Sequence, residues 1–169
     1  MSEAPPGSRG FTLGPALLFV PGDRPERLAK ALERADAAIL DLEDAVAPHA
    51  KTVAREAMIA ADPDPERVVV RVNGPETPEF AHDLAALSQT RVRSVMVAKA
   101  EDPASLAPLA DYDVIALCET ARGVVAAEQL AALPQVVALM WGAEDLVASL
   151  GGTSSRFADG TYRDVARLA

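Results

Sequence analysis

The sequence predicts an α/β fold with a mainly parallel sheet of about six β/α units. Short apolar runs without polar alternation recur along the chain, and such runs are typical of strands covered on both faces. A segment with helical patterning follows each run, which indicates an α/β architecture. The pattern by itself fits an open parallel sheet as well as a barrel.

The predicted strands are the apolar runs that end at turn or polar residues. Pro21-Gly22 and Asn73-Gly74 close two of them, and Pro25 suits the first turn of the helix that follows the first strand. The expected strands are residues 16–20, 37–41, 67–71, 92–98, 113–117 and 136–140. The expected helices are residues 25–34, 51–60, 77–87, 103–110, 121–133, 144–150 and 161–169.

One apolar side chain from each strand is expected to be buried in the core. These six residues are Leu18, Leu40, Val69, Val95, Ile115 and Leu139. The Pro-, Gly- and Ser-rich residues 1–14 are expected to form a flexible tail. Residues 15–169 would then form a single domain.

Composition narrows the classes of function. The 16 Lys and Arg residues face 25 Asp and Glu residues, and this formal charge of −9 argues against nonspecific nucleic-acid binding. The single cysteine, Cys118, excludes an intrachain disulfide and a cysteine-rich metal site. The longest apolar runs, such as residues 16–20, are too short to span a bilayer. We therefore expect a cytoplasmic protein that binds neither membranes nor nucleic acids.

Polar side chains follow every predicted strand, at the end where parallel α/β folds bind ligands. We interpret them as one site, although Asp23, Lys99 or Arg122 taken singly could equally be a helix cap or a surface charge. The residues are Asp23 and Arg24, Glu43 and Asp44, Arg71 and Asn73, Lys99, Glu119 and Arg122, and Glu144 and Asp145.

Glu119 and Asp145 are the strongest metal-ligand candidates. Each follows an apolar strand in a short Gly- or Ala-rich turn, where a partly desolvated carboxylate needs a partner. The histidines, His49 and His82, lie away from the strand ends, so the pattern does not favour zinc. Two carboxylates with room for water and substrate oxygens suit Mg²⁺, or by the same chemistry Mn²⁺.

Five segments, in order and at natural strand spacing, resemble the citrate lyase β-subunit-like family. Its members are magnesium-dependent CoA-ester lyases of the aldolase and phosphoenolpyruvate-binding barrel superfamily, which cleave thioesters such as citryl-, malyl- or citramalyl-CoA. The segments are residues 18–27 (LFVPGDRPER), 39–46 (ILDLEDAV), 70–74 (VRVNG), 119–124 (ETARGV) and 141–146 (WGAEDL).

The resemblance implies a role for each matching residue. Glu119 and Asp145 would bind Mg²⁺ and, with Arg71, make up the catalytic set. Arg71 and Glu119 would also contact the 2-oxo-acid part of the substrate, and the backbone amides of three residues would hold its carboxylate. These are Gly142, Ala143 and Glu144. Glu43 and Asp44 would lie outside the direct ligands, around the metal-bound waters.

Other readings stay open beside these roles. Arg71 could instead form a buried ion pair with Glu43 or Asp44. The residues Asp23, Arg24 and Arg27 could meet CoA phosphates, or they could be a solvated helix start, which we prefer. A CoA-independent hydroxy-keto-acid aldolase of the same superfamily is the alternative activity.

The resemblance also implies the fold: residues 15–169 would be the N-terminal portion of a single TIM-type (β/α)8 barrel domain, here incomplete with about six β/α units present. The chain departs from the family at its C-terminal end. A (β/α)8 barrel takes about 250 residues, and the family's last strands, His-Pro signature and lid do not appear before residue 169. The resemblance implies a homo-oligomer in which the lid brings an acidic residue, a candidate catalytic base, to a neighbouring subunit. We expect the sequence to belong to a longer protein. A short form that keeps the site without turnover is the alternative.

Overall fold

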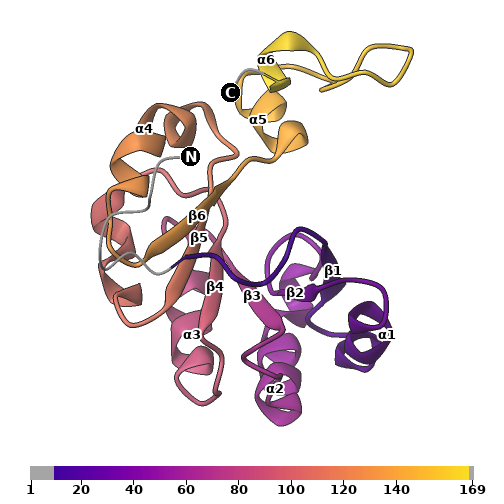
Figure 1. Ribbon diagram of the computed structural model, residues 1–169, viewed down its shortest axis with the longest axis vertical. Helices are drawn as coiled ribbons and strands as arrows, with labels where there is room; N and C mark the ends of the chain where they lie inside the picture. The colour runs from indigo at the N-terminus through magenta and orange to yellow at the C-terminus, as the bar shows by residue number, and fades with distance from the viewer. Residues whose placement is uncertain (1–9, 168–169) are drawn as a thin grey trace.

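The computed structural model describes residues 10–167, in which six parallel strands form one curled sheet (Figure 1). The strands pair in the order of the sequence, from β1 to β6, with one register irregularity between β5 and β6 at Val114 and Ile115. The strands are β1 (Leu17–Pro21), β2 (Ala37–Asp41), β3 (Val68–Val72), β4 (Ser94–Val97), β5 (Asp113–Leu117) and β6 (Val136–Met140).

Helices follow each strand, as the pattern predicted. Figure 1 shows α1 to α4 around the outside of the sheet, while α5 and α6 project beyond the carboxyl end of β6. The helices are α1 (Leu28–Leu32), α2 (Lys51–Ala61), α3 (Pro78–Leu87), α4 (Ala121–Ala131), α5 (Ala143–Ser149) and α6 (Asp164–Arg167). The segment Pro103–Leu109 is a 3₁₀-helix that contains Pro108, whose missing N–H cannot join an α-helical ladder.

Side chains alternate between two apolar clusters on the two faces of the sheet. The outer cluster packs against the helices and includes Leu40, Val70, Val95 and Ala116, all fully buried. The inner cluster lies on the concave face and consists of Ile39, Val69, Met96, Ile115 and Leu117. Both faces are therefore covered, which explains the continuous apolar runs of the central strands.

Two of the six residues predicted to be buried are exposed, because they lie on the edge strands of the sheet. Leu40, Val69, Val95 and Ile115 are buried as expected, but Leu18 and Leu139 are each 43% exposed. Leu18 lies on β1 and Leu139 on β6, and within residues 10–167 these two strands each have one neighbour and do not pair with each other. The barrel is thus not closed, and outward-facing side chains of both edges lack a covering element.

The chain ahead of β1 is partly described. Leu13 packs against the inner cluster, and the Ala16 amide donates to the Asp36 carboxylate over 2.9 Å. Residues 1–9 of the predicted tail, and residues 168–169 of the last predicted helix, lie outside the described residues. No helix within 10–167 has the length and apolar character needed to cross a membrane.

Candidate active site and metal centre

Arg71 is the centre of a buried ion-pair network at the carboxyl ends of β2 and β3. Asp41 and Arg71 are register partners on these strands, so both side chains reach the concave face at the same level. The Arg71 Nε donates to Asp41 Oδ1 over 2.7 Å and its Nη2 to Oδ2 over 2.6 Å. The fully buried Asp41 also accepts the amides of Glu43 and Ala45, so each carboxylate oxygen has two donors.

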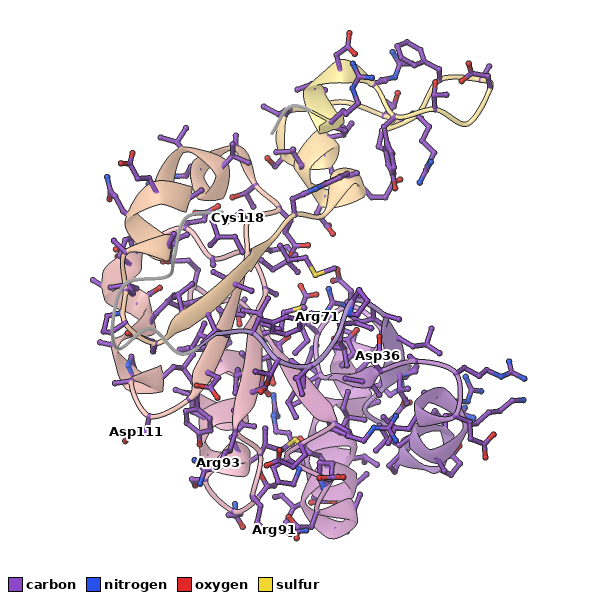
Figure 2. All side chains as sticks on the ribbon, in the orientation of Figure 1. Asp36, Arg71, Arg91, Arg93, Asp111 and Cys118 are labelled. Carbon is purple, nitrogen blue, oxygen red and sulfur yellow. The ribbon has the colours of Figure 1, made fainter. Side chains whose placement is uncertain are left out.

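Two further groups surround the Arg71 guanidinium. Its Nη1 lies 3.2 Å from Glu43 Oε2, and its plane stacks 4.9 Å from the centroid of the Phe19 ring. Burial by itself would lower the pKa of Arg71, but the bonds to Asp41 and the charge of Glu43 outweigh it and raise the pKa. Arg71 is therefore a fixed cation, and Figure 2 shows it near the centre of the curled sheet.

Lys99 lies between three carboxylates, two that follow β2 and one that follows β5. Its ammonium is hydrogen-bonded to Glu43 Oε1, and it lies 3.8 Å from Asp44 Oδ2 and 3.9 Å from Glu119 Oε1. Burial raises the pKa of Glu43, although Lys99 and Arg71 oppose that rise. Burial would lower the pKa of Lys99, but the bond to Glu43 and the other two carboxylates raise it.

Glu119 is the second residue after β5 and is only 2% exposed. Its Oε1 accepts the backbone N–H of Lys99 over 3.1 Å. Its Oε2 lies against the backbone of Gly142, where an added Cβ would come within 2.7 Å of that oxygen. Burial raises the pKa of Glu119 to about 7; Lys99 opposes the rise, and Asp145 adds to it. A second cation near this carboxylate would therefore stabilise its charged form.

Asp145 lies in the first turn of α5, beyond β6. It is half-buried, and its negative charge lies close enough to Glu119 to raise the pKa of that carboxyl group. The Glu144 side chain instead accepts a hydrogen bond from the Ser155 hydroxyl. The amide of Ala121, at the start of α4, donates to Ser149 Oγ over 2.9 Å and ties the end of α5 to the neighbouring unit.

The structure brings together Glu43, Asp44, Arg71, Lys99 and Glu119, and it turns two other strand-end residues away. Asn73 bonds to Asp83 and to the Leu42 carbonyl. Arg122, whose side chain is 86% exposed, pairs with Glu101 at 3.6 Å. Sequence reasoning missed Asp41 because it read as the last residue of a strand. The signal was an acid closing an apolar run beside an arginine at the same level of the next strand.

The donor set is compatible with a hard divalent cation. Within residues 10–167, no three His, Cys, Asp or Glu side chains converge in the arrangement of an all-protein metal site. Glu119 and Asp145 would thus supply two oxygens, with water and substrate oxygens completing the shell, which is the arrangement that Mg²⁺ favours. His82, whose side chain is 66% exposed on α3, pairs with Glu79 and not with this site.

The chain is similar to known proteins over most of its length. The model of the HpcH/HpaI aldolase/citrate lyase family matches residues 16–167. A citrate lyase subunit beta-like protein of Mycobacterium tuberculosis is 57% identical over 154 residues, which are 91% of this chain and 56% of the relative. The mitochondrial citramalyl-CoA lyase of Homo sapiens is 33% identical over 171 residues, 83% of this chain and 50% of the relative.

A solved structure matches the fold closely. The citrate lyase beta subunit of M. tuberculosis, complexed with oxaloacetate and magnesium, superimposes with a TM-score of 0.88 at 56% identity. The match covers 92% of this chain and 70% of that one. Its fold is a TIM-type barrel, and this chain spans about half the length of the curated relatives it matches. The chain belongs to the HpcH/HpaI aldolase/citrate lyase family.

Proposed function

We propose that this chain carries the magnesium and 2-oxo-acid site of a carbon–carbon lyase acting on a 3-hydroxyacyl-CoA thioester, such as citryl-, malyl- or citramalyl-CoA. The observation that carries the proposal is the buried Glu119 beside Asp145, across from the fixed cation Arg71. The family supports it, since relatives include a citramalyl-CoA lyase and a (3S)-malyl-CoA thioesterase.

Magnesium would be held by Glu119 and Asp145 and would supply Lewis-acid polarisation of the substrate's hydroxyl and carboxylate oxygens. Glu43 and Asp44 would accept hydrogen bonds from the metal's water ligands. The crystal structure of the CitE protein of M. tuberculosis contains magnesium, acetoacetate and coenzyme A, and it matches this chain at 56% identity and a TM-score of 0.89. That complex supports a site for a small oxo acid and coenzyme A in this family.

The proposed reaction is a retro-Claisen cleavage. A base removes the proton of the 3-hydroxyl, the C2–C3 bond breaks as the C3 carbonyl forms, and C2 leaves as the thioester enolate. Protonation of C2 gives the acyl-CoA, and the other product is a 2-oxo acid. Arg71 would attract the oxo acid with its remaining N–H groups, because Asp41 occupies Nε and Nη2 on one side.

The backbone amides of Gly142, Ala143 and Glu144 would bind the carboxylate of the same product. The first amides of a helix have no carbonyl partner within it, and α5 begins at Ala143. Two acidic side chains, Glu144 and Asp145, lie in that turn, but the Glu144 carboxylate is held by Ser155. The amides therefore remain the donors for a bound anion.

Turnover by the full-length protein tests the proposal. We expect Mg²⁺-dependent cleavage of at least one thioester in a panel of citryl-, malyl- and citramalyl-CoA. Glu119→Gln and Asp145→Asn should abolish it, while Glu128→Gln, an exposed change on α4, should not. Cleavage of a hydroxy keto acid without CoA would favour the aldolase alternative. Magnesium-independent turnover would refute the metal role.

The proposal extends to the assembly and location of the full-length protein. We propose a cytoplasmic homo-oligomer whose barrel includes residues 15–169 of this chain as its N-terminal portion. Light scattering after size-exclusion chromatography measures the mass, and a monomer would contradict the first part. Fractionation of the source cells tests the second.

A further inference from the structure

Lys99 adopts a backbone conformation that its residue type disfavours. Its φ is +50°, in the left-handed region that L-residues with a side chain seldom enter. Within residues 10–167 the other non-glycine residue of this kind is Asp62, which caps the end of α2, a common place for that conformation. Lys99 caps no helix. It follows β4, and its conformation directs its N–H to Glu119 Oε1.

The same residue reaches the other side of the site with its side chain. The Lys99 ammonium bonds to Glu43 and lies within 4 Å of Asp44 and Glu119. Arg71 contacts Glu43 from the opposite side, at 3.2 Å. Glu43 is thus held between two cations. Among the ion pairs of the described residues, Glu119 has one cation within 4 Å, which is Lys99.

The charges of this cluster do not balance. Five carboxylates lie at these strand ends, and Arg71 binds one of them with two bonds. Lys99 pairs with Glu43, and the Lys51 ammonium donates to the carbonyls of Leu42 and Glu43, so three cations face five carboxylates. The carboxylates are Asp41, Glu43, Asp44, Glu119 and Asp145. A divalent cation bound to Glu119 would lie close to the Lys99 ammonium and would be repelled by it.

We propose that Lys99 is a positioning residue that serves as the resident counter-cation of this cluster and shares its carboxylates with the incoming metal. In the metal-free protein the ammonium holds Glu43, Asp44 and Glu119 together against their mutual repulsion. Its charge also weakens metal binding, so that the ion and product can leave. This inference rests on the proposed metal site at Glu119 and Asp145.

A merely structural role makes a different prediction. If Lys99 only supported its strained loop, its loss would lower stability and leave the affinity for Mg²⁺ unchanged or weaker. If it is the counter-cation, removal of its charge must tighten Mg²⁺ binding while it destabilises the metal-free protein. The two readings therefore differ in the sign of one measurable effect.

The test uses Mg²⁺ alone, with calorimetric titration and thermal melting of the full-length protein. Lys99→Met should bind Mg²⁺ at least about tenfold more tightly than the wild type, because repulsion between like charges is lost. Its metal-free Tm should fall, and saturating Mg²⁺ should raise its Tm more than that of the wild type. Lys99→Arg should stay within about threefold of the wild-type affinity, since it keeps the charge. Lys30→Met, on exposed α1, removes a distant charge as the matched control.

The possible results separate the counter-cation role of Lys99 from the proposed metal site itself. Unchanged or weaker Mg²⁺ binding by Lys99→Met, with normal binding by the wild type, overturns this inference alone. Absence of Mg²⁺ binding by the wild type overturns both the proposed metal site and this inference. If Lys99→Met does not fold, the comparison moves to Glu43→Gln and the double variant Glu43→Gln/Lys99→Met. The double variant should bind Mg²⁺ more tightly, and the opposite order refutes the counter-cation.

Discussion

Replacing Arg71 with lysine removes the fork that binds Asp41 while it keeps the positive charge. In the structure the guanidinium gives Asp41 two charge-assisted bonds, of 2.7 and 2.6 Å, inside a fully buried pair. A lysine ammonium can replace one of these bonds but not both, and it does not stack on Phe19 in the same way. Asp41 keeps its two backbone donors, so no carboxylate oxygen is left without a partner.

The expected loss of stability follows from these contacts. One hydrogen bond to a charged group contributes about 1.5–3 kcal/mol, and the contact of a cation with an aromatic ring about 0.5–1 kcal/mol. The free energy of unfolding should therefore fall by about 2–4 kcal/mol. For a domain of this size that corresponds to a decrease in Tm of about 4–16 °C. Activity should fall as well, because the same fork orients the N–H groups that face the substrate.

Urea unfolding and thermal melting of the full-length protein measure the effect, with Arg91→Lys as the matched control. Arg91 pairs with Asp62 at 2.7 Å, but both side chains are largely exposed, so its replacement should cost less than about 1 kcal/mol. Figure 2 shows Arg91 at the lower edge of the molecule, away from Arg71 near its centre. Equal losses in the two variants, or a stable Arg71→Lys protein that has lost only turnover, would show that the Asp41 pair is not the source of stability.

Three further predictions concern other buried contacts. The raised pKa of Glu119, about 7 against an ordinary 4.5, means that the metal-free protein loses stability as pH rises from 4.5 through 7. Glu119→Gln should remove that loss, which is up to about 3 kcal/mol in the free energy of unfolding between pH 5 and pH 8. Urea unfolding at the two pH values measures it, and the same change in unfolding free energy in both proteins would contradict the prediction. Gly142→Ala places a Cβ 2.7 Å from Glu119 Oε2, so calorimetry should show Mg²⁺ affinity reduced by at least about tenfold, and unchanged affinity would refute the contact. Asp83→Asn leaves the buried Arg55 without the carboxylate charge that Nε contacts at 2.7 Å, and unfolding should become about 3–5 kcal/mol easier; a loss below 1 kcal/mol would mean that Glu79 suffices for Arg55.

The strands and the location of the site could be predicted because they depend on local patterns. Continuous apolar runs placed all six strands within one or two residues, and polar residues after the runs marked the carboxyl ends. The edges could not be predicted in this way, since Leu18 and Leu139 have the same apolar context as Leu40. Their exposure depends on which strands pair beyond them, and that is not a property of their own segments.

The partners inside the site were also beyond sequence reasoning. Arg71 was expected to meet substrate, or else Glu43 or Asp44, but its main partner is Asp41, which the register of two distant segments selects. Lys99 was noticed as a strand-end residue without an assigned role. Its importance appears only when the left-handed backbone and three neighbouring carboxylates are seen together.

The order of the strands has a consequence for how the protein folds during synthesis. Because β1 to β6 pair strictly in sequence order, each strand can dock on the one that left the ribosome just before it. Arg71 is synthesised after both Asp41 and Glu43 and pairs with each of them, and Lys99 later adds a second cation to Glu43. Glu119 emerges when Lys99 is already available to receive it. Vectorial synthesis thus supplies a cation to each acid in turn, and the nascent chain need not bury an unpaired carboxylate.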